Sequence, residues 1–140
     1  MKALLAIDPG NRSGLAWFSN GVLFRAEVGF IDSPPQCPFP SGFQAVVEKP
    51  QYHAGTKNPA DIITLALTAG RWVQWAYNHG AADVVTVFPV QWKGSVTKAV
   101  NHARIIKRLS PNEQTIWHEC RTDEHDAIGI GMKFLGRMGR

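Results

Sequence analysis

The sequence of 140 residues is poor in cysteine and has no long hydrophobic run. Its two cysteines, Cys37 and Cys120, are too few for a disulfide framework, and their spacing matches no zinc motif. No apolar run approaches the ~20 residues that a membrane-spanning helix needs, and the N-terminus lacks the features of a signal peptide. We therefore expect a soluble, intracellular protein with reduced thiols and no membrane partner.

The chain also lacks internal repeats and interdomain linkers, which predicts a single domain over residues 1–140. Apolar residues make up 44% of the sequence and charged residues 19%, so the chain is not disordered. Acidic residues are absent between Asp83 and Glu113, where five basic residues fall: Lys93, Lys98, Arg104, Lys107 and Arg108. Such a basic block is either a solvated face or a binding site for a polyanion.

The first third of the chain has the pattern of β-strands. Apolar runs predict strands at residues 3–7, 14–18, 22–30 and 44–48. Asn20-Gly21 between two of these runs is a strong hairpin signal. Residues 32–42 contain four prolines and should form an exposed loop, because proline is excluded from the interior of a sheet.

The remainder of the chain is mainly helical. Asn58-Pro59 is a typical helix start, and the helix should run to about residue 78 before Gly80. A buried strand is predicted at 83–88. Three further helices are predicted: one at 96–109, a short one that begins at the capping box 110–113, and one at 123–136 with Thr122 as its cap. This order predicts an α/β fold in which an antiparallel hairpin region is extended by parallel strands, with helices on the faces.

Four acidic residues lie at the ends of these elements, where burial alone would not place them. Asp8 and Glu48 end two predicted strands, and Asp123 and Asp126 share one face of the last helix. Carboxylates held close together repel and stay ionised only around a cation, and oxygen ligands favour Mg²⁺ or Mn²⁺. Alternatively, Asp8 starts a turn, and the other two aspartates complement a helix dipole.

Three motifs carry a resemblance to a known family. AIDPGNRSGLAW, VVEKPQYH and TDEHDAIGIG follow one another in the order and at about the separations seen in RuvC-type Holliday-junction resolvases. That family belongs to the RNase H-like nucleases, so the resemblance implies an RNase H-like, five-stranded mixed sheet flanked by helices. Compact phage-encoded members have a similarly short stretch between the first two motifs.

The resemblance implies a function as well as a fold. By matching position, Asp8, Glu48, Asp123 and Asp126 resemble the metal-binding, catalytic carboxylates, with two Mg²⁺ or Mn²⁺ ions in each site. The expected activity is a crossover junction endonuclease, a homodimer that makes paired nicks in a four-way DNA junction. It would act in the cytoplasm of a bacterial cell or of a phage-infected host. The alternatives are a related nuclease for other branched DNA or RNA precursors, and a non-catalytic junction-binding module.

The resemblance also indicates DNA contacts. Tyr52, next to the position of the family's aromatic wedge, is a candidate for stacking into an opened junction, although simple loop packing is the alternative. Lys93 and Lys98 resemble lysines beside the metal site, and Arg104 and Lys107 are further candidates, although cations also suit helix C-termini. His125 is either a phosphate or proton-transfer group or a solvated histidine.

The helix at 59–78 is apolar nearly all round, which favours cover on two sides. At 100° per residue a broad stripe should face the sheet, with Trp75 almost opposite: Ile62, Leu65, Ala66, Ala69, Trp72, Val73 and Ala76. Either a second subunit or the proline-rich loop could cover the other side. RuvC-type enzymes pack two protomers through this helix.

Overall fold

The computed structural model describes residues 2–52 and 58–139, and its strands form one five-stranded mixed sheet. The strands are β1 (Ala3–Asp8), β2 (Ser13–Ser19), β3 (Val22–Gly29), β4 (Gln44–Glu48) and β5 (Asp83–Val87). Their order across the sheet is β3-β2-β1-β4-β5; β1 to β3 are antiparallel neighbours, and β1, β4 and β5 run parallel. The predicted α/β class and mixed sheet are confirmed.

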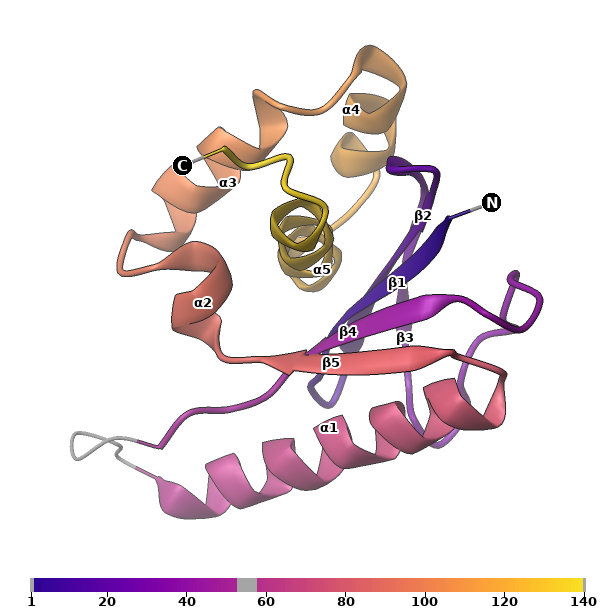
Figure 1. The fold of residues 1–140 in the computed structure, drawn as a ribbon. Coiled ribbons are helices and arrows are strands. Elements are labelled where there is room, and N and C mark those ends of the chain that lie inside the picture. Colours follow the sequence, from indigo (N-terminus) through magenta and orange to yellow (C-terminus); the bar gives the residue numbers. More distant parts are fainter. Residues whose placement is uncertain (1, 53–57, 140) are drawn as a thin grey trace.

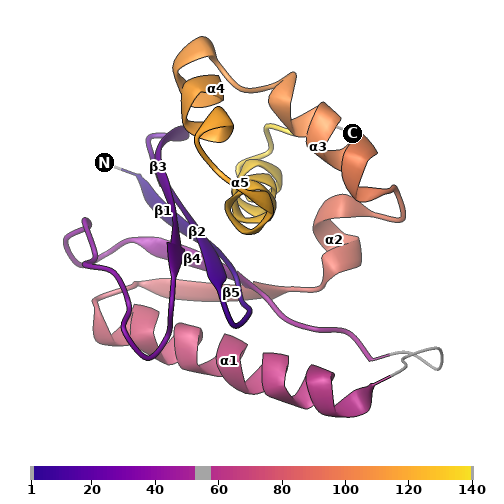
Figure 2. The same cartoon turned by 180° about the vertical axis from the view of Figure 1, so that it is seen from behind.

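Helices cover both faces of the sheet (Figure 1). One face carries α1 (Pro59–Asn78), and the other carries α2 (Pro89–Lys93), α3 (Lys98–Ile106), α4 (Pro111–His118) and α5 (Thr122–Phe134). Figure 2, from behind, shows the same two layers, with α5 between the sheet and the arc of α2, α3 and α4. Contacts of α5 with β1 and β2 make it the central helix of its layer.

Residue alternation along β1 decides which side chains face which layer. Leu5 and Ile7 join the core cluster of α1, whereas Leu4 and Ala6 join the cluster of α5. Because side chains alternate along a strand, Asp8 points to the same face as Leu4 and Ala6. The sheet therefore presents Asp8 to the α5 layer.

The predicted stripe on α1 is partly wrong. Trp75 is only 7% exposed and packs against Trp17 and Trp72, whereas Leu65 is 37% exposed. The proline-rich loop explains the difference, because Phe39 packs on Trp17 and widens the buried face at the C-terminal half of α1. The N-terminal half of α1 projects beyond the strands (Figure 1) and keeps its apolar side chains exposed.

Most predicted boundaries lie within a few residues of the observed ones. The hairpin at Asn20-Gly21 is present, and both residues have the positive φ (51° and 81°) that its turn requires. Three details differ from the prediction. The short helix α2, which begins at Pro89, was not predicted, and α3 is shorter than the predicted helix at 96–109. The residue before the first turn of α5 is Arg121 and not Thr122. Cys37 and Cys120 are free thiols. Within residues 2–52 and 58–139, no helix combines the length and hydropathy that a membrane crossing requires.

The buried Glu113 carboxylate links β3, the start of α4 and the C-terminal segment. It accepts hydrogen bonds from the backbone N–H groups of Leu23 and Ser110 and from both terminal nitrogens of Arg137, the latter at 2.7 Å. Burial alone would raise its pKa, but the Arg137 hydrogen bonds and charge and the two backbone donors outweigh burial and lower the pKa to about 2. This carboxylate therefore fastens β3, α4 and the C-terminal segment together in its ionised form.

We expect Glu113 to make the fold sensitive to acid. A carboxylate with a lowered pKa stabilises the fold fully above its unfolded pKa of 4.5, and this contribution is lost as the pH falls toward about 2. At about 1.4 kcal/mol per pKa unit, it is worth about 3 kcal/mol. Urea unfolding of the wild type should show this loss, and Glu113→Gln should be less stable at pH 7 with a flatter profile. Equal pH profiles for the two proteins would contradict the assignment.

Candidate metal and nucleic-acid site

The sheet register brings Asp8 and Glu48 side by side. β1 and β4 pair in parallel up to Ile7 and Val47, and Asp8 and Glu48 are the next residue on each strand. Neighbouring strands lie about 4.8 Å apart. Val46 packs in the α5 cluster, so Glu48, two residues later, faces the same layer as Asp8. Two acidic side chains therefore meet where the parallel strands end.

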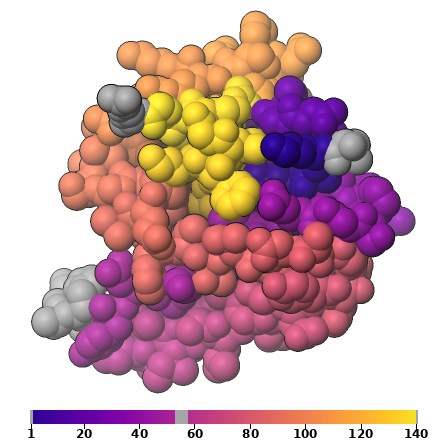
Figure 3. All heavy atoms as spheres, viewed as in Figure 1, coloured from indigo at the N-terminus to yellow at the C-terminus, as the bar shows by residue number. Residues whose placement is uncertain are grey.

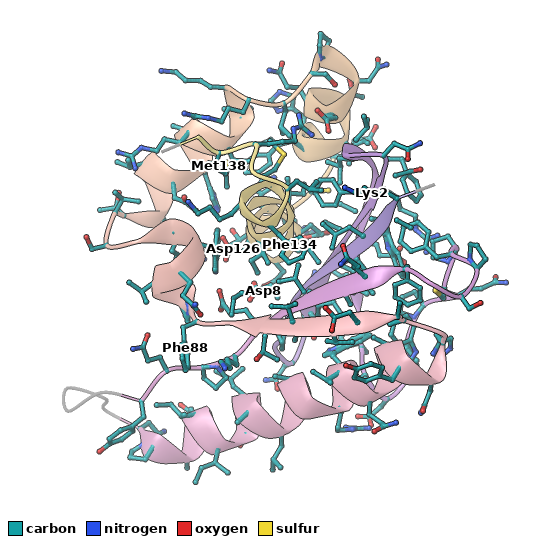
Figure 4. All side chains as sticks on the ribbon, in the orientation of Figure 1. Lys2, Asp8, Phe88, Asp126, Phe134 and Met138 are labelled. Atoms are coloured by element: carbon teal, nitrogen blue, oxygen red, sulfur yellow. The ribbon has the colours of Figure 1, made fainter. Side chains whose placement is uncertain are left out.

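Gly14 allows α5 to approach this end of the sheet. Gly14 pairs with Asp8 across β1 and β2, and a Cβ atom there would lie 1.9 Å from the Asp123 carbonyl oxygen. The first turn of α5 thus rests on the bare backbone of β2. Asp123 and Asp126, three residues apart on this turn, project from one face of the helix. Figure 4 shows Asp8 and Asp126 close together on the α5 side of the sheet.

The other three acids act electrostatically on Asp8. Burial, followed by the charges of Glu48, Asp126 and Asp123, raises the pKa of Asp8 to about 8, against a smaller opposing effect of Lys98. Burial also raises the pKa of Glu48, although the Trp92 hydrogen bond and the Lys93 charge oppose it. The structure therefore gathers all four predicted acids, and their roles remain predictions.

Basic and donor side chains of the same chain offset much of this negative charge. Asp126 accepts from Lys98 Nζ at 3.0 Å and lies 2.9 Å from His102 Nε2. Arg12 Nε is 3.7 Å from Asp123 Oδ2, and the Trp92 indole N–H donates to Glu48. Glu48, Asp123 and Asp126 therefore each have a partner of their own among the described residues.

The donor chemistry of the site fits a hard divalent cation, because four carboxylates supply only oxygen ligands, and burial with the neighbouring charges disfavours an ionised Asp8 without a cation. The side-chain positions do not form a ligand shell: among the residues described, no three His, Cys, Asp or Glu side chains converge as metal ligands do. Binding an ion would require Asp126 and Asp123 to exchange their cationic partners for it.

Three side chains that contact the carboxylates were not predicted from the sequence: Arg12, Trp92 and His102. His102 follows Lys98 by four residues, a spacing that places both on one face of α3 and could have identified it. Trp92 lies on the unpredicted helix α2, and Arg12 follows the Asp-Pro-Gly turn. No sequence signal links Trp92 to Glu48, since the two are 44 residues apart.

His125 is part of an aromatic cluster and is not a solvated side chain. Its ring stacks on Trp117 at 3.7 Å, and its Nε2 lies 2.8 Å from the Trp117 carbonyl oxygen. Burial, with the nearby charge of His102, lowers the pKa of His125. The edge of Trp117 meets the ring of His102, so this cluster fixes the histidine that contacts Asp126.

The predicted DNA-contacting residues do not all lie at the carboxylates. Lys98 contacts Asp126, and Lys93 lies over the Trp92 ring next to Glu48. Arg104 and Lys107 are exposed toward the end of α3, and no ion pair joins either to an acid among the described residues. Tyr52 is 67% exposed and free to stack on a ligand.

Comparison with known proteins identifies the fold. No protein-family model matches the sequence, and no curated protein matches it. Two solved structures match over nearly the full length: Thermus thermophilus RuvC in complex with a Holliday junction substrate, and another Thermus thermophilus RuvC structure. The chain has a RuvC-like fold. The complex with the Holliday junction matches with a TM-score of 0.62 and 20% sequence identity, and the match covers 99% of this chain and 97% of the other. The second structure matches with a TM-score of 0.58 and 19% sequence identity, and the match covers 98% of this chain and 96% of the other.

Within this RuvC-like fold, we predict that Gly14→Ala displaces α5 from the carboxylate end of the sheet. The added methyl group would collide with backbone and not with a movable side chain, so a loss of stability of about 1–3 kcal/mol is expected. Gly70→Ala is the matched control, because a Cβ atom at this helical position meets nothing within 4 Å and alanine favours helix. Urea unfolding should show a loss for Gly14→Ala only; equal stability of both variants would refute the close approach.

Proposed function

We propose that the chain is a metal-dependent endonuclease that resolves four-way DNA junctions by paired nicks. The observation that carries this proposal is the gathering of four acids from three distant segments on a RuvC-like fold. A solved structure with this fold is described as bound to a Holliday junction substrate, which supports branched DNA as the ligand class. We expect the protein to act where such DNA is found, in the cytoplasm.

In this proposal Asp8, Glu48, Asp123 and Asp126 hold two divalent ions, Mg²⁺ or Mn²⁺. Such ions supply Lewis acidity, which activates water and stabilises the departing 3′ oxygen of a phosphodiester. Trp92 orients Glu48 through its N–H group, and His102 orients Asp126. The products would carry 5′-phosphate and 3′-hydroxyl ends.

The chain's own cations would hold the DNA at this site. Lys98 and Lys93 lie beside the carboxylates and are placed to contact the phosphate that is cut or its neighbours. Arg104 and Lys107 would add phosphate contacts that supply affinity without reading sequence. Tyr52 is exposed and would stack on a base at the opened centre of a junction.

The decisive experiment compares the wild type with Asp8→Asn on a four-way junction, a linear duplex and a single-stranded RNA, each with and without Mg²⁺. We expect symmetric, Mg²⁺-dependent nicks in the junction alone. Asp8→Asn should bind the junction but cut at least 100-fold more slowly. It should also melt at a higher temperature at pH 7 without Mg²⁺, because the pKa of about 8 means that folding must protonate Asp8, which the unfolded chain keeps ionised.

Asp32→Asn, which changes an exposed aspartate paired with Arg71, is the matched control and should cut as the wild type does. Binding without cutting by the wild type would favour a non-catalytic junction-binding module. Preferred cleavage of the RNA, or of a flapped DNA added as a fourth substrate, would favour a nuclease of the same fold with another substrate.

We further propose that the enzyme is a homodimer packed through α1. The N-terminal half of this helix leaves Ile63 at 62% and Leu67 at 67% exposure, while the proline-rich loop covers only the C-terminal half. An apolar helix face of this kind is typical of an interface. A two-fold axis would present two equivalent carboxylate sites to the two equivalent strands of a junction.

Substitution of this face should separate the protomers. Leu67→Glu places a charge in the proposed interface, so light scattering after size-exclusion chromatography should give the mass of one chain instead of two. Val22→Glu on the exposed edge strand is the control and should leave the mass unchanged. A monomeric wild type would refute the dimer without affecting the proposed chemistry.

A further inference from the structure

A basic cavity of about 420 Å³ opens between α2, α3 and the C-terminal segment, apart from the carboxylates. Its lining includes four cationic side chains, the amide of Asn101 and the ring of Trp92; the cations are Lys93, Arg104, Arg108 and Lys133. Figure 3 shows the face on which the residues of α2 and α3 border the C-terminal residues, and Figure 4 places Met138, which also lines the cavity, there. We call this feature the basic cavity.

Among the described residues, no acidic side chain balances the charge of the basic cavity. No acidic residue lines it, and among the described residues none of its four cations takes part in an ion pair. Helix dipoles account for only part of this charge. Each C-terminus carries about half a negative charge, so the ends of α2, α3 and α5 together offset at most about 1.5 of the four positive charges.

A polar side chain of α3 adds a further hydrogen-bonding group to the cavity. Asn101 lines it beside the cations. Of the described residues, only Trp75 has a buried side-chain nitrogen or oxygen without a hydrogen-bond partner, so Asn101 is not an orphaned amide and its role here is supplementary. Its amide can add one donor to the cations that would attract an anion.

We propose that the basic cavity binds a backbone phosphate of the DNA substrate, beyond the bond that is cut. This inference rests on the proposed nuclease function. Arginine and lysine together suit phosphate, since guanidinium groups donate two parallel hydrogen bonds and ammonium groups add a point charge. The volume admits a phosphate with its flanking sugars, for which Val90, Trp92 and Met138 supply apolar lining beside the cations.

The cavity is within reach of a strand that passes the carboxylates. Asp126 and Lys133 lie seven residues apart on α5, which corresponds to about 10 Å along the helix. At about 3.4 Å per nucleotide of one strand in a duplex, this is about three nucleotides. Trp92 forms part of the cavity wall and donates to Glu48, so one side chain borders both sites.

Two double variants of equal charge test the proposal in the full-length protein. Arg104→Gln with Lys133→Gln removes two cations from the cavity, whereas Lys2→Gln with Arg25→Gln removes one cation just before β1 and one from β3. Junction and duplex binding are measured without divalent ions at several salt concentrations. The cavity variant should lose about tenfold in affinity, and its salt dependence should flatten by about one per lost phosphate contact. The control variant should change less than about twofold.

Nuclear magnetic resonance locates the contact directly. Addition of DNA should shift the Asn101 side-chain amide and the Trp92 indole N–H in the wild type but not in the cavity variant, with inorganic pyrophosphate as a separate probe. The cavity variant should melt no lower than the wild type, because removal of like charges relieves repulsion. This control separates loss of binding from loss of folding.

Each remaining outcome overturns either the cavity or the proposed function. Equal loss in both double variants would mean that only the general positive field attracts DNA, and a shift with pyrophosphate but not with DNA would assign the cavity to a free phosphate compound. Binding of duplex and junction alike, without cleavage when Mg²⁺ is added, would refute the nuclease while the two variants still decide the cavity. No binding of either DNA would refute both.

Discussion

The gathering of four acidic side chains at one end of the sheet is the main electrostatic constraint on the site. Asp8 is buried among Glu48, Asp123 and Asp126, and this environment raises its pKa to about 8. A fold gains nothing in stability from such an arrangement. The surrounding cations Lys98 and Arg12, the imidazole of His102 and the N–H of Trp92 are therefore arranged around it as compensation. Clusters of ionisable groups with strongly shifted pKa values, which lower the stability of the fold, are typical of functional sites.

The arrangement depends on backbone geometry more than on the acids themselves. The parallel register of β1 and β4 places Asp8 and Glu48 together, and strand alternation turns both toward α5. The missing side chain at Gly14 then lets the first turn of α5 rest on β2. Without that contact, the α5 aspartates would stand farther from the sheet. Small residues at such crossings thus determine the chemistry although they take no part in it.

The sequence predicted local features well and tertiary ones less well. The hairpin at Asn20-Gly21, the start of α1 and the capping box at Ser110 each have a mechanism within a few residues, and all three elements are present. The burial of Trp75 depends on Phe39 in a distant loop, so periodicity along α1 placed it wrongly. The same holds for the site: strand ends and helix starts flagged the acids, whereas Trp92 reaches Glu48 only through the fold.

The basic residues of α3 lie at two different sites. Lys98 and His102 lie one turn apart and face Asp126. Asn101 and Arg104 lie on the adjacent face and line the basic cavity with Arg108, which follows the helix, and buried Ile105 lies between the two faces. A lysine paired with a carboxylate is a poor ligand for phosphate until that carboxylate has another partner. The unpaired cations of the cavity have no such requirement. In the proposed function, Lys98 would therefore become available to a phosphate only after Asp126 had bound a divalent cation, whereas the cavity could bind a phosphate without one.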